Sequence, residues 1–536
     1  MIRSATMLDE FTPEERHALA PYFTNLDGPV FALVNLPEVV KGALFARYSR
    51  SPKSLRRLFL DEFLKDAREG TAPAPAAVGT RRADELYERV FVEYGDDSVA
   101  QLGGVHLACE GASNILTKLL EWGRLMAYLE QSTRYIPYDS RLGGRYRYWR
   151  DPEIARSPLG ARYVADLDVL FDTYARMLPE LMEWARARYP KEPGDSDFVY
   201  KQTIKAKACD AARGILPGAT LSNVGIYGTG QAFEALLLRM RAHPLPEARQ
   251  YAAMMLHELR KVIPSFLTRV DRPERGGAWT EYLAGTRQAT AELVDRLLAD
   301  DAPEPRPAVV LTDFDPDGEE KLLAAVCYPH TNLPEDQIRA RVRRLSTDER
   351  ATLLRAYVGD RSNRRHKPGR AFERTDYRFD VLCDYGAFRD LQRHRMLTIE
   401  WQPLSPAHGY NVPEAVAEAG LAEPFEDAMA VSAALYDALA PALPEQAPYA
   451  VSLAYRVRFA VQMNAREAMH MLELRTSPQG HPAYRRVCQE MHRLIADEAG
   501  HRAVAAAMRH VDHTTYELER LTAERAAEQR RAAPRS

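Results

Sequence analysis

The sequence predicts an α/β protein, helix-rich in the manner of α+β folds, in which two tandem repeats form a pseudo-dimer. Its 536 residues are too many for one hydrophobic core, so two or more domains are expected. A proline-rich stretch, "DDAPEPRPA" at 300–308, divides the chain into halves of similar length. Three prolines in five positions exclude a helix there and favour an extended spacer.

The two halves begin with similar segments. "VFALVNLPEVVKGALFARYS" starts at Val30 and "VVLTDFDPDGEEKLLAAVCY" starts at Val309. Both segments predict a short β-branched strand, a turn with proline and a helix. The two segments start 309 − 30 = 279 residues apart, and Pro37 and Pro316 are separated by the same distance along the chain. We therefore expect repeat one at 1–299, the linker at 300–308, repeat two at 309–520 and a charged tail at 521–536.

Hydrophobic periodicity predicts mostly helices joined by short strands. In the stretch 111–131 the apolar residues Ile115, Leu119, Trp122 and Met126 recur at spacings of four, three and four, which favours one amphipathic helix. The other expected elements are helices at 248–263 and 465–475 and strands at 30–34, 309–312 and 377–382.

The composition is that of a soluble protein expected in the cytoplasm. A net charge of −3, from 72 basic and 75 acidic residues, gives no overall attraction to nucleic acid. Five cysteines without a CxxC pair argue against a structural zinc site or a disulfide framework, and we expect no metal site. The sequence shows neither the hydrophobic core of a signal peptide nor a run of about 18 apolar residues, so we expect no membrane partner.

Three consecutive cationic side chains stand out in the second half. Arg393, His394 and Arg395 repel one another unless an anion lies among them. On a helix they would point about 100° apart, but at a loop or helix end they can surround a larger anionic ligand. The alternative is a solvated basic patch that Asp390 and Glu400 offset.

The first half contains a segment suited to a nucleotide, "YLEQSTRY" at 128–135. In an extended chain Glu130, Ser132 and Arg134 lie on one face and offer an acceptor, a hydroxyl and a guanidinium. Arg213, four residues before a helix-breaking Pro-Gly pair, is a further candidate. The alternatives are an amphipathic strand with a surface ion pair and an arginine that favours a helix C-terminus.

Asn464 can cap the helix predicted at 465–475, which leaves Arg466 in the first helical turn. A cation is unfavourable there because of the helix dipole, so Arg466 indicates a bound anion rather than a stabilising device. The turn "GTGQAF" at 228–233 lacks the spacing of a dinucleotide fingerprint, so no phosphate is assigned to it.

In split form, these motifs resemble those of the flavin-dependent thymidylate synthase family, the ThyX type. That family carries Arg-His-Arg, seven further residues and then a serine within Glu-x-Ser-x-Arg-Tyr. The second half keeps the triplet but has Trp401 and Pro403 at the later positions. The first half has Trp122-Gly123-Arg124 in place of the triplet and keeps the later residues, Glu130, Ser132 and Arg134.

Two more motifs are divided in the same way. The family's Ala-Arg-x-x-Leu-Pro is present only in the first half, at 212–217. Its Asn-x-Arg and Leu-Arg are present in the second half, at 464–466 and 474–475. Complementary losses are expected where composite sites survive and redundant ones decay, although two copies that decay independently can give the same pattern.

The resemblance implies ligands for both sets of residues. It implies that FAD is bound by Arg393, His394, Arg395, Asn464 and Arg466. It implies that dUMP is bound by Glu130, Ser132, Arg134, Arg213 and Arg475. Because the family binds these ligands between subunits, we expect a homo-oligomer, such as a dimer of two-repeat chains.

The implied activity is that of an FAD-dependent thymidylate synthase. Such an enzyme methylates dUMP to dTMP with carbon from methylenetetrahydrofolate and hydride from reduced FAD, with NADPH as a further co-substrate. No residue is assigned a catalytic role beyond ligand positioning. Asp390 stands where the family has a dUMP-contacting glutamine. Two alternatives therefore stay open: a diverged flavin- or nucleotide-binding protein that methylates another pyrimidine, and a non-catalytic homologue.

Overall fold

The computed structural model describes residues 11–27, 33–48, 53–64, 101–134, 136–518 and, in the tail, 520, 521, 524, 525, 528 and 529. The chain forms two compact units. Unit 1 comprises Met1–Glu110, Gly123–Glu130 and Asn223–Asp301, and unit 2 comprises Gly111–Trp122, Gln131–Ser222 and Ala302–Ser536. Unit 2 thus combines segments from both sequence halves. No helix among the described residues is long and apolar enough to cross a membrane.

Unit 1 holds most of a three-stranded sheet in the order β1-β3-β2. The strands are β1 (Gly104–Ser113), β2 (Met126–Glu130) and β3 (Leu221–Thr229). β2 and β3 are antiparallel, with Met126 opposite Gly228. The helices of unit 1 are α1 (Pro13–Leu19), α2 (Glu38–Tyr48), α3 (Leu55–Leu58), α9 (Gly230–Arg241), α10 (Pro246–Leu259) and α11 (Ala278–Leu297).

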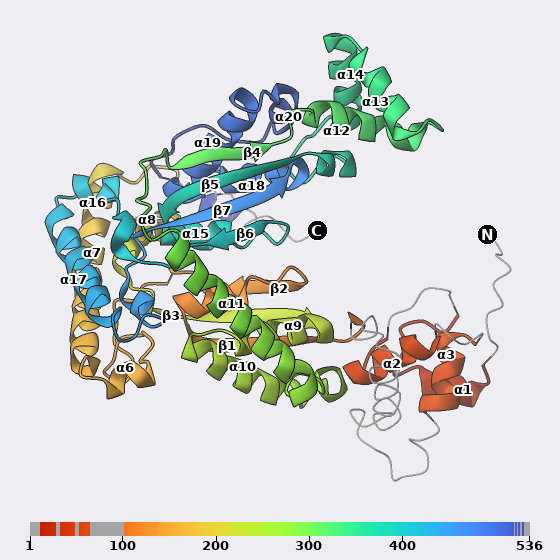
Figure 1. Cartoon of the computed structure of the whole chain (residues 1–536), viewed down its shortest axis with the longest axis horizontal. Helices are drawn as coiled ribbons and strands as arrows, with labels where there is room; N and C mark the ends of the chain where they lie inside the picture. The colour runs from red at the N-terminus through yellow and green to blue at the C-terminus, as the bar shows by residue number, and fades with distance from the viewer. Residues whose placement is uncertain are drawn as a thin grey trace. The chain divides into compact units, whose positions relative to one another are not determined.

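Unit 2 contains a four-stranded antiparallel sheet in the order β4-β5-β7-β6. The strands are β4 (Val309–Phe314), β5 (Asp376–Asp384), β6 (Thr398–Trp401) and β7 (Arg456–Asn464). Residues along β5 and β7 alternate between buried and partly exposed, as expected for strands with one face on a core. Three helices pack against this sheet, as Figure 1 shows: α15 (Tyr385–Leu391), α18 (Ala465–Arg475) and α19 (Pro482–Asp497).

Long helices form a second layer of unit 2. α7 (Gly160–Arg188) packs against both α8 (Asp197–Ala212) and α17 (Ala422–Leu439). The other α-helices of unit 2 are α5 (Asn114–Leu120), α6 (Pro152–Arg156), α12 (Gly318–Cys327), α13 (Glu335–Arg343), α14 (Thr347–Val358), α16 (Glu414–Glu418) and α20 (Arg502–Ala507).

The two sheets share one pattern of strands and helices. The order β1-β3-β2 recurs as β5-β7-β6. Along the chain, α5 follows β1 as α15 follows β5, and α9 follows β3 as α18 follows β7. The helix caps also correspond, because Ser113 and Asp384 accept from the third residues of α5 and α15. Thr229 and Asn464 do the same for α9 and α18. The helix-rich α+β class is confirmed, and the matching sheets agree with a tandem arrangement.

Within unit 2, the corresponding segments 214–219 and 449–454 exchange hydrogen bonds reciprocally. The amide of Leu453 donates to the carbonyl oxygen of Leu216 at 2.9 Å, and Gly218 donates to Val451 at 2.8 Å. A second reciprocal pair joins Ala454 to Gly214 and Ala219 to Tyr449, each at 2.9 Å. Equivalent residues thus contact each other in both directions, which is the pattern that a two-fold axis produces.

Most of the expected elements are confirmed. The helix at 465–475 is α18, the helix at 248–263 is α10, and the strands at 309–312 and 377–382 are β4 and β5. Residues 301–307 form neither helix nor strand, as expected of the linker. Of the strand expected at 30–34, residues 30–32 lie outside the described residues.

The single helix predicted at 111–131 is wrong. The structure has α5, a turn at 121–125 and then β2. Gly123 lies in this turn, and the segment after it pairs with β3 instead of continuing the helix. Ladder pairing with a neighbouring strand thus overrides the helical spacing of the apolar residues.

Candidate functional site

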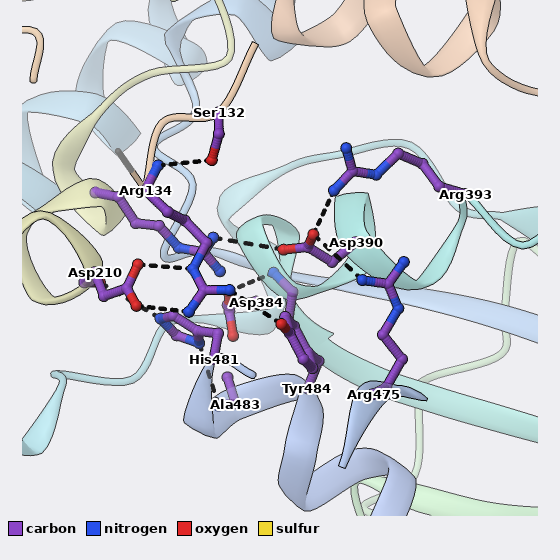
Figure 2. Close-up of polar contacts among 12 residues, drawn as sticks. Ser132, Arg134, Asp210, Asp384, Asp390, Arg393, Arg475, His481, Ala483 and Tyr484 are labelled. Atoms are coloured by element: carbon purple, nitrogen blue, oxygen red, sulfur yellow. Dashed lines mark hydrogen bonds and ion pairs between the residues drawn. The ribbon is translucent and has the colours of Figure 1, made fainter. Parts of the chain in front are cut away.

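A buried aspartate in unit 2 is surrounded by arginines from both sequence halves. Asp390, near the end of α15, accepts a hydrogen bond on Oδ1 from Nη2 of Arg393. Nη1 of Arg475 lies 3.7 Å from the same oxygen, and Nη1 of Arg213 lies 3.6 Å from Oδ2. Figure 2 shows Asp390 between Arg393 and Arg475.

Asp390 is ionised in this setting. Burial alone would raise the pKa of its carboxyl group, because the charged form loses water. The charges of Arg393, Arg475 and Arg213 outweigh burial and hold this pKa well below its usual value. The carboxylate therefore fixes three guanidinium groups around one point, as a charge-assisted network does.

A second ion pair lies next to this cluster. Arg134 donates from Nε and Nη2 to the two carboxylate oxygens of Asp210, at 2.8 and 2.7 Å. Its Nη1 donates to the hydroxyl of Tyr484 at 3.0 Å, and Figure 2 shows this arrangement. Arg134 is buried, and its neighbour Ser132 accepts a hydrogen bond from the Arg134 amide at 3.2 Å.

Arg213 is a buried cation of this site whose contacts leave part of its guanidinium group over. The residue is 4% exposed, and its Nη2 has no hydrogen-bond partner among the described residues. A Cβ atom at Gly386 would lie 3.2 Å from that nitrogen, so glycine leaves it room. A buried guanidinium nitrogen without a partner is costly, and an anionic ligand would satisfy it.

His394 is a neutral imidazole held at both ring nitrogens. Its Nε2 accepts a hydrogen bond from Nε of Arg475 at 2.9 Å. Its Nδ1 therefore carries the proton and faces Oε1 of Glu467 at 3.1 Å. Burial, Arg475 and His470 lower the pKa of His394 well below its usual value.

His394, Glu467 and His470 bring three potential metal-ligand atoms within 4.8 Å of one another. Cations surround this group: Lys367 and Arg364 add to the effect of burial, which lowers the pKa of His470 to about 4. A divalent cation would be repelled by these charges. We therefore assign no metal to the group.

Two cavities are lined by neighbours of the arginine cluster, although no arginine of the cluster lines either of them. One of about 300 Å³ is lined in part by Asp210 and His481, and another of about 590 Å³ by Asp384. Arg486 lines both. His481 caps α19, since its Nδ1 accepts from the amide of Ala483 at 3.2 Å, and its pKa is lowered well below the usual value by burial and by Arg213. His481 is therefore a neutral side chain beside the charged cluster.

The structure places the residues expected from the sequence in two groups. The cluster brings together Arg134, Arg213, Arg393, His394 and Arg475, and Ser132 adjoins it through the backbone of Arg134. Other residues are placed elsewhere. Arg395 is exposed in the turn after α15, and Glu130 lies at the end of β2 in unit 1.

Asn464 and Arg466 make contacts within the chain. Asn464 caps α18 by accepting from the Glu467 amide at 2.9 Å, as its sequence position indicates. Arg466 donates to the carbonyl oxygen of Pro368 at 3.0 Å and to Glu373 at 3.3 Å. The helix dipole led us to expect a bound anion beside Arg466. The carboxylate of Glu373 supplies part of that negative charge from within the chain.

The extended segment expected at 128–135 is wrong beyond Glu130. β2 ends at that residue, and Thr133 and Arg134 lie in a turn. Glu130, Ser132 and Arg134 therefore do not share one face of a strand. Tyr135 lies outside the described residues.

Sequence reasoning missed the acidic partners and their neighbours. Asp210, His481 and Tyr484 were not singled out. Asp390 was noted as a replacement for glutamine and as an acid that offsets the basic patch, and the structure pairs it with Arg393. Asp210 stands three residues before Arg213 on a predominantly buried helix, which is the one signal that the sequence offered.

Comparison with known proteins finds the same family in both halves of the chain. The family model of the thymidylate synthase complementing protein, Thy1, matches residues 43–265 and 310–499. A UPF0159 protein of Chlamydia muridarum is 37% identical over 521 residues, which cover 96% of this chain and 98% of that one. A UPF0159 protein of Thermoplasma acidophilum is 31% identical over 509 residues, 90% of this chain and 97% of that one.

Among solved structures, a UMP/dUMP methylase, PolB from Streptomyces cacaoi, bound with 5-Br dUMP, aligns with 37% of this chain and 94% of its own. The identity is 19% and the TM-score is 0.30. The resemblance of the split motifs to the ThyX type is confirmed by the family match, which covers most of both halves. The chain therefore belongs to the Thy1 family, the family of the thymidylate synthase complementing protein.

Proposed function

We propose that the chain is an FAD-dependent thymidylate synthase that methylates dUMP to dTMP, with methylenetetrahydrofolate, reduced FAD and NADPH as the other reactants. The observation that carries this proposal is Arg213, a 4% exposed arginine whose Nη2 has no hydrogen-bond partner in the part of the chain that the structure describes. It lies within a cluster of four arginines against two ionised aspartates, Asp390 and Asp210. This excess of positive charge suits a phosphate.

The substrate phosphate is assigned to Arg213 and Arg475. Both contact Asp390. Nη2 of Arg213 has no hydrogen-bond partner among the described residues, whereas Arg475 also donates from Nε to His394. Arg134 is already bound to Asp210 on two sides, so its role is to position the segment that begins at Ser132.

FAD is assigned to the cationic turn after α15. Arg393 is 30% exposed and Arg395 is exposed, so both can meet the cofactor phosphates. Arg466 is 38% exposed and can contribute. His394 and Asn464 have their polar atoms engaged within the chain, which limits them to holding the turn and the start of α18. When bound, the flavin would supply hydride to the pyrimidine.

Purified full-length protein tests the proposal. We expect a flavin absorption spectrum, and dTMP as product when dUMP, methylenetetrahydrofolate, FAD and NADPH are supplied. Parallel assays with UMP and dUMP report which pyrimidine is methylated. Binding of dUMP without flavin or turnover would contradict the synthase and favour a non-catalytic homologue, and turnover of UMP alone would favour a different pyrimidine methylase.

A further inference from the structure

Unit 1 contains a cavity of about 610 Å³ whose lining residues all belong to that unit. It is lined by the turn before β2, by α9, and by the start of α11 with the residues that precede it. A volume of this size lies within the range of small-molecule sites.

Three small residues open this cavity. The turn after α5 corresponds to the turn after α15, so Gly123 occupies the place of His394. The capping residues Thr229 and Asn464 align α9 with α18, so Ala232 corresponds to Glu467 and Ala235 to His470. Gly123, Ala232 and Ala235 all line the cavity. In the second repeat, the corresponding three side chains contact one another.

The cavity lining is basic. It includes two glutamates, Glu234 and Glu274, and four arginines, Arg124, Arg239, Arg269 and Arg275. Arg269 and Glu234 balance each other through two hydrogen bonds, at 3.1 and 2.7 Å. Burial lowers the pKa of Arg239, and Arg287 acts in the same direction. Arginines outnumber glutamates in this lining by four to two, a composition that favours an anionic ligand.

The same lining offers large apolar side chains. Leu125 is 68% exposed and Trp279 is 54% exposed, although both are of types that usually gain from burial. Met126 and Leu236 add apolar surface inside. A tryptophan at the edge of a basic cavity provides a face on which a flat ring can stack.

We propose that this cavity binds a flat aromatic molecule that carries anionic groups. The ring would pack against Trp279 and Leu125, while carboxylate or phosphate groups would meet the arginines. Both kinds of anion fit this chemistry. The proposal is independent of the function proposed for the arginine cluster of unit 2.

Calorimetric titration of the full chain tests this site with three probes. Folic acid carries a ring and carboxylates, ADP carries a ring and phosphates, and pyrophosphate carries phosphates without a ring. One variant, Ala235→Phe, places bulk in the cavity at an exposed position. Another, Arg124→Glu with Arg275→Glu, reverses two exposed charges. Arg296→Glu, on α11 outside the lining, is the matched control.

We expect one ring-bearing probe to bind wild type, with affinity lowered by about tenfold or more in both cavity variants and unchanged in the control. Binding of folic acid would identify a carboxylate ligand, and binding of ADP a phosphate ligand. Arg213→Ala should leave this affinity unchanged, which separates it from the site of unit 2. No binding of either ring-bearing probe would overturn the proposal. So would equal affinity in Ala235→Phe and wild type, or pyrophosphate binding as tight as that of the ring-bearing probe.

Discussion

The guanidinium group of Arg134 binds the carboxylate of Asp210 at two points, with N–O distances of 2.8 and 2.7 Å. Its remaining contacts are the hydroxyl of Tyr484 at 3.0 Å and the carbonyl oxygen of Gln479 at 3.3 Å. Arg134 and Asp210 come from the first sequence half, and Tyr484 and Gln479 come from the second. This ion pair therefore ties the two halves together inside unit 2.

Replacing Asp210 by asparagine should lower the free energy of unfolding by about 3–5 kcal/mol, because it leaves a buried arginine without its counter-charge. Urea denaturation measures this change. Asp360→Asn is the control, since Asp360 forms an exposed pair with Arg509 at 3.0 Å and should leave stability nearly unchanged. Equal effects of the two substitutions would contradict the structural role of the Arg134–Asp210 pair.

Gly218→Ala tests the reciprocal contact between the two halves. A Cβ atom there would lie 2.7 Å from the carbonyl oxygen of Pro448, a backbone atom that cannot move easily. We expect a loss of about 1–3 kcal/mol in unfolding free energy, the usual cost of overpacking. At Gly194, a Cβ atom would meet no atom of the described residues within 4 Å, so Gly194→Ala is the matched control. A tolerated Gly218→Ala would show that the two segments do not pack as described.

The buried carboxyl of Glu467 should make stability depend on pH. Burial raises its pKa from 4.5 to about 7, against the opposing charge of Lys367. The folded protein therefore keeps a proton that the unfolded chain releases. The stability from this group is fully present below about pH 4.5 and is lost as the pH rises through about 7.

Glu467→Gln removes this titration. Between pH 4.5 and 7, the free energy of unfolding of wild type should fall by about 1–3 kcal/mol relative to that of Glu467→Gln. Above pH 7 the difference between the two proteins should stay constant. Denaturation at several pH values measures it. A difference that does not change with pH would mean that Glu467 is ionised throughout.

Local signals in the sequence predicted much of the second repeat. Asn464 caps α18, prolines mark the linker, and β-branched runs mark β4, so each element depends on residues within a few positions. The stretch 111–131 has an equally regular pattern but forms a helix, a turn and a strand. There the outcome depends on pairing with β3, about 100 residues away along the chain, which no local pattern contains.

The same limit applies to the site. The motifs of the resemblance identified Arg134, Arg213, Arg393 and Arg475, which the structure places together. Their spacing could not show that Arg134 is paired with Asp210 or that Arg395 is exposed. Both properties depend on how distant segments pack together. The motifs pointed to cations that the structure places near one another, and the structure shows which carboxylates pair with them.

The central claim is that Arg213 awaits the phosphate of the substrate, and calorimetric titration with dUMP tests it most directly. Wild type, Arg213→Ala and Arg509→Ala are compared, Arg509 being a surface arginine 46% exposed in the same unit. We expect Arg213→Ala to weaken dUMP binding by about 1.5–3 kcal/mol, or about tenfold to a hundredfold, while Arg509→Ala binds like wild type. Equal affinity of Arg213→Ala and wild type for dUMP would contradict the composite site.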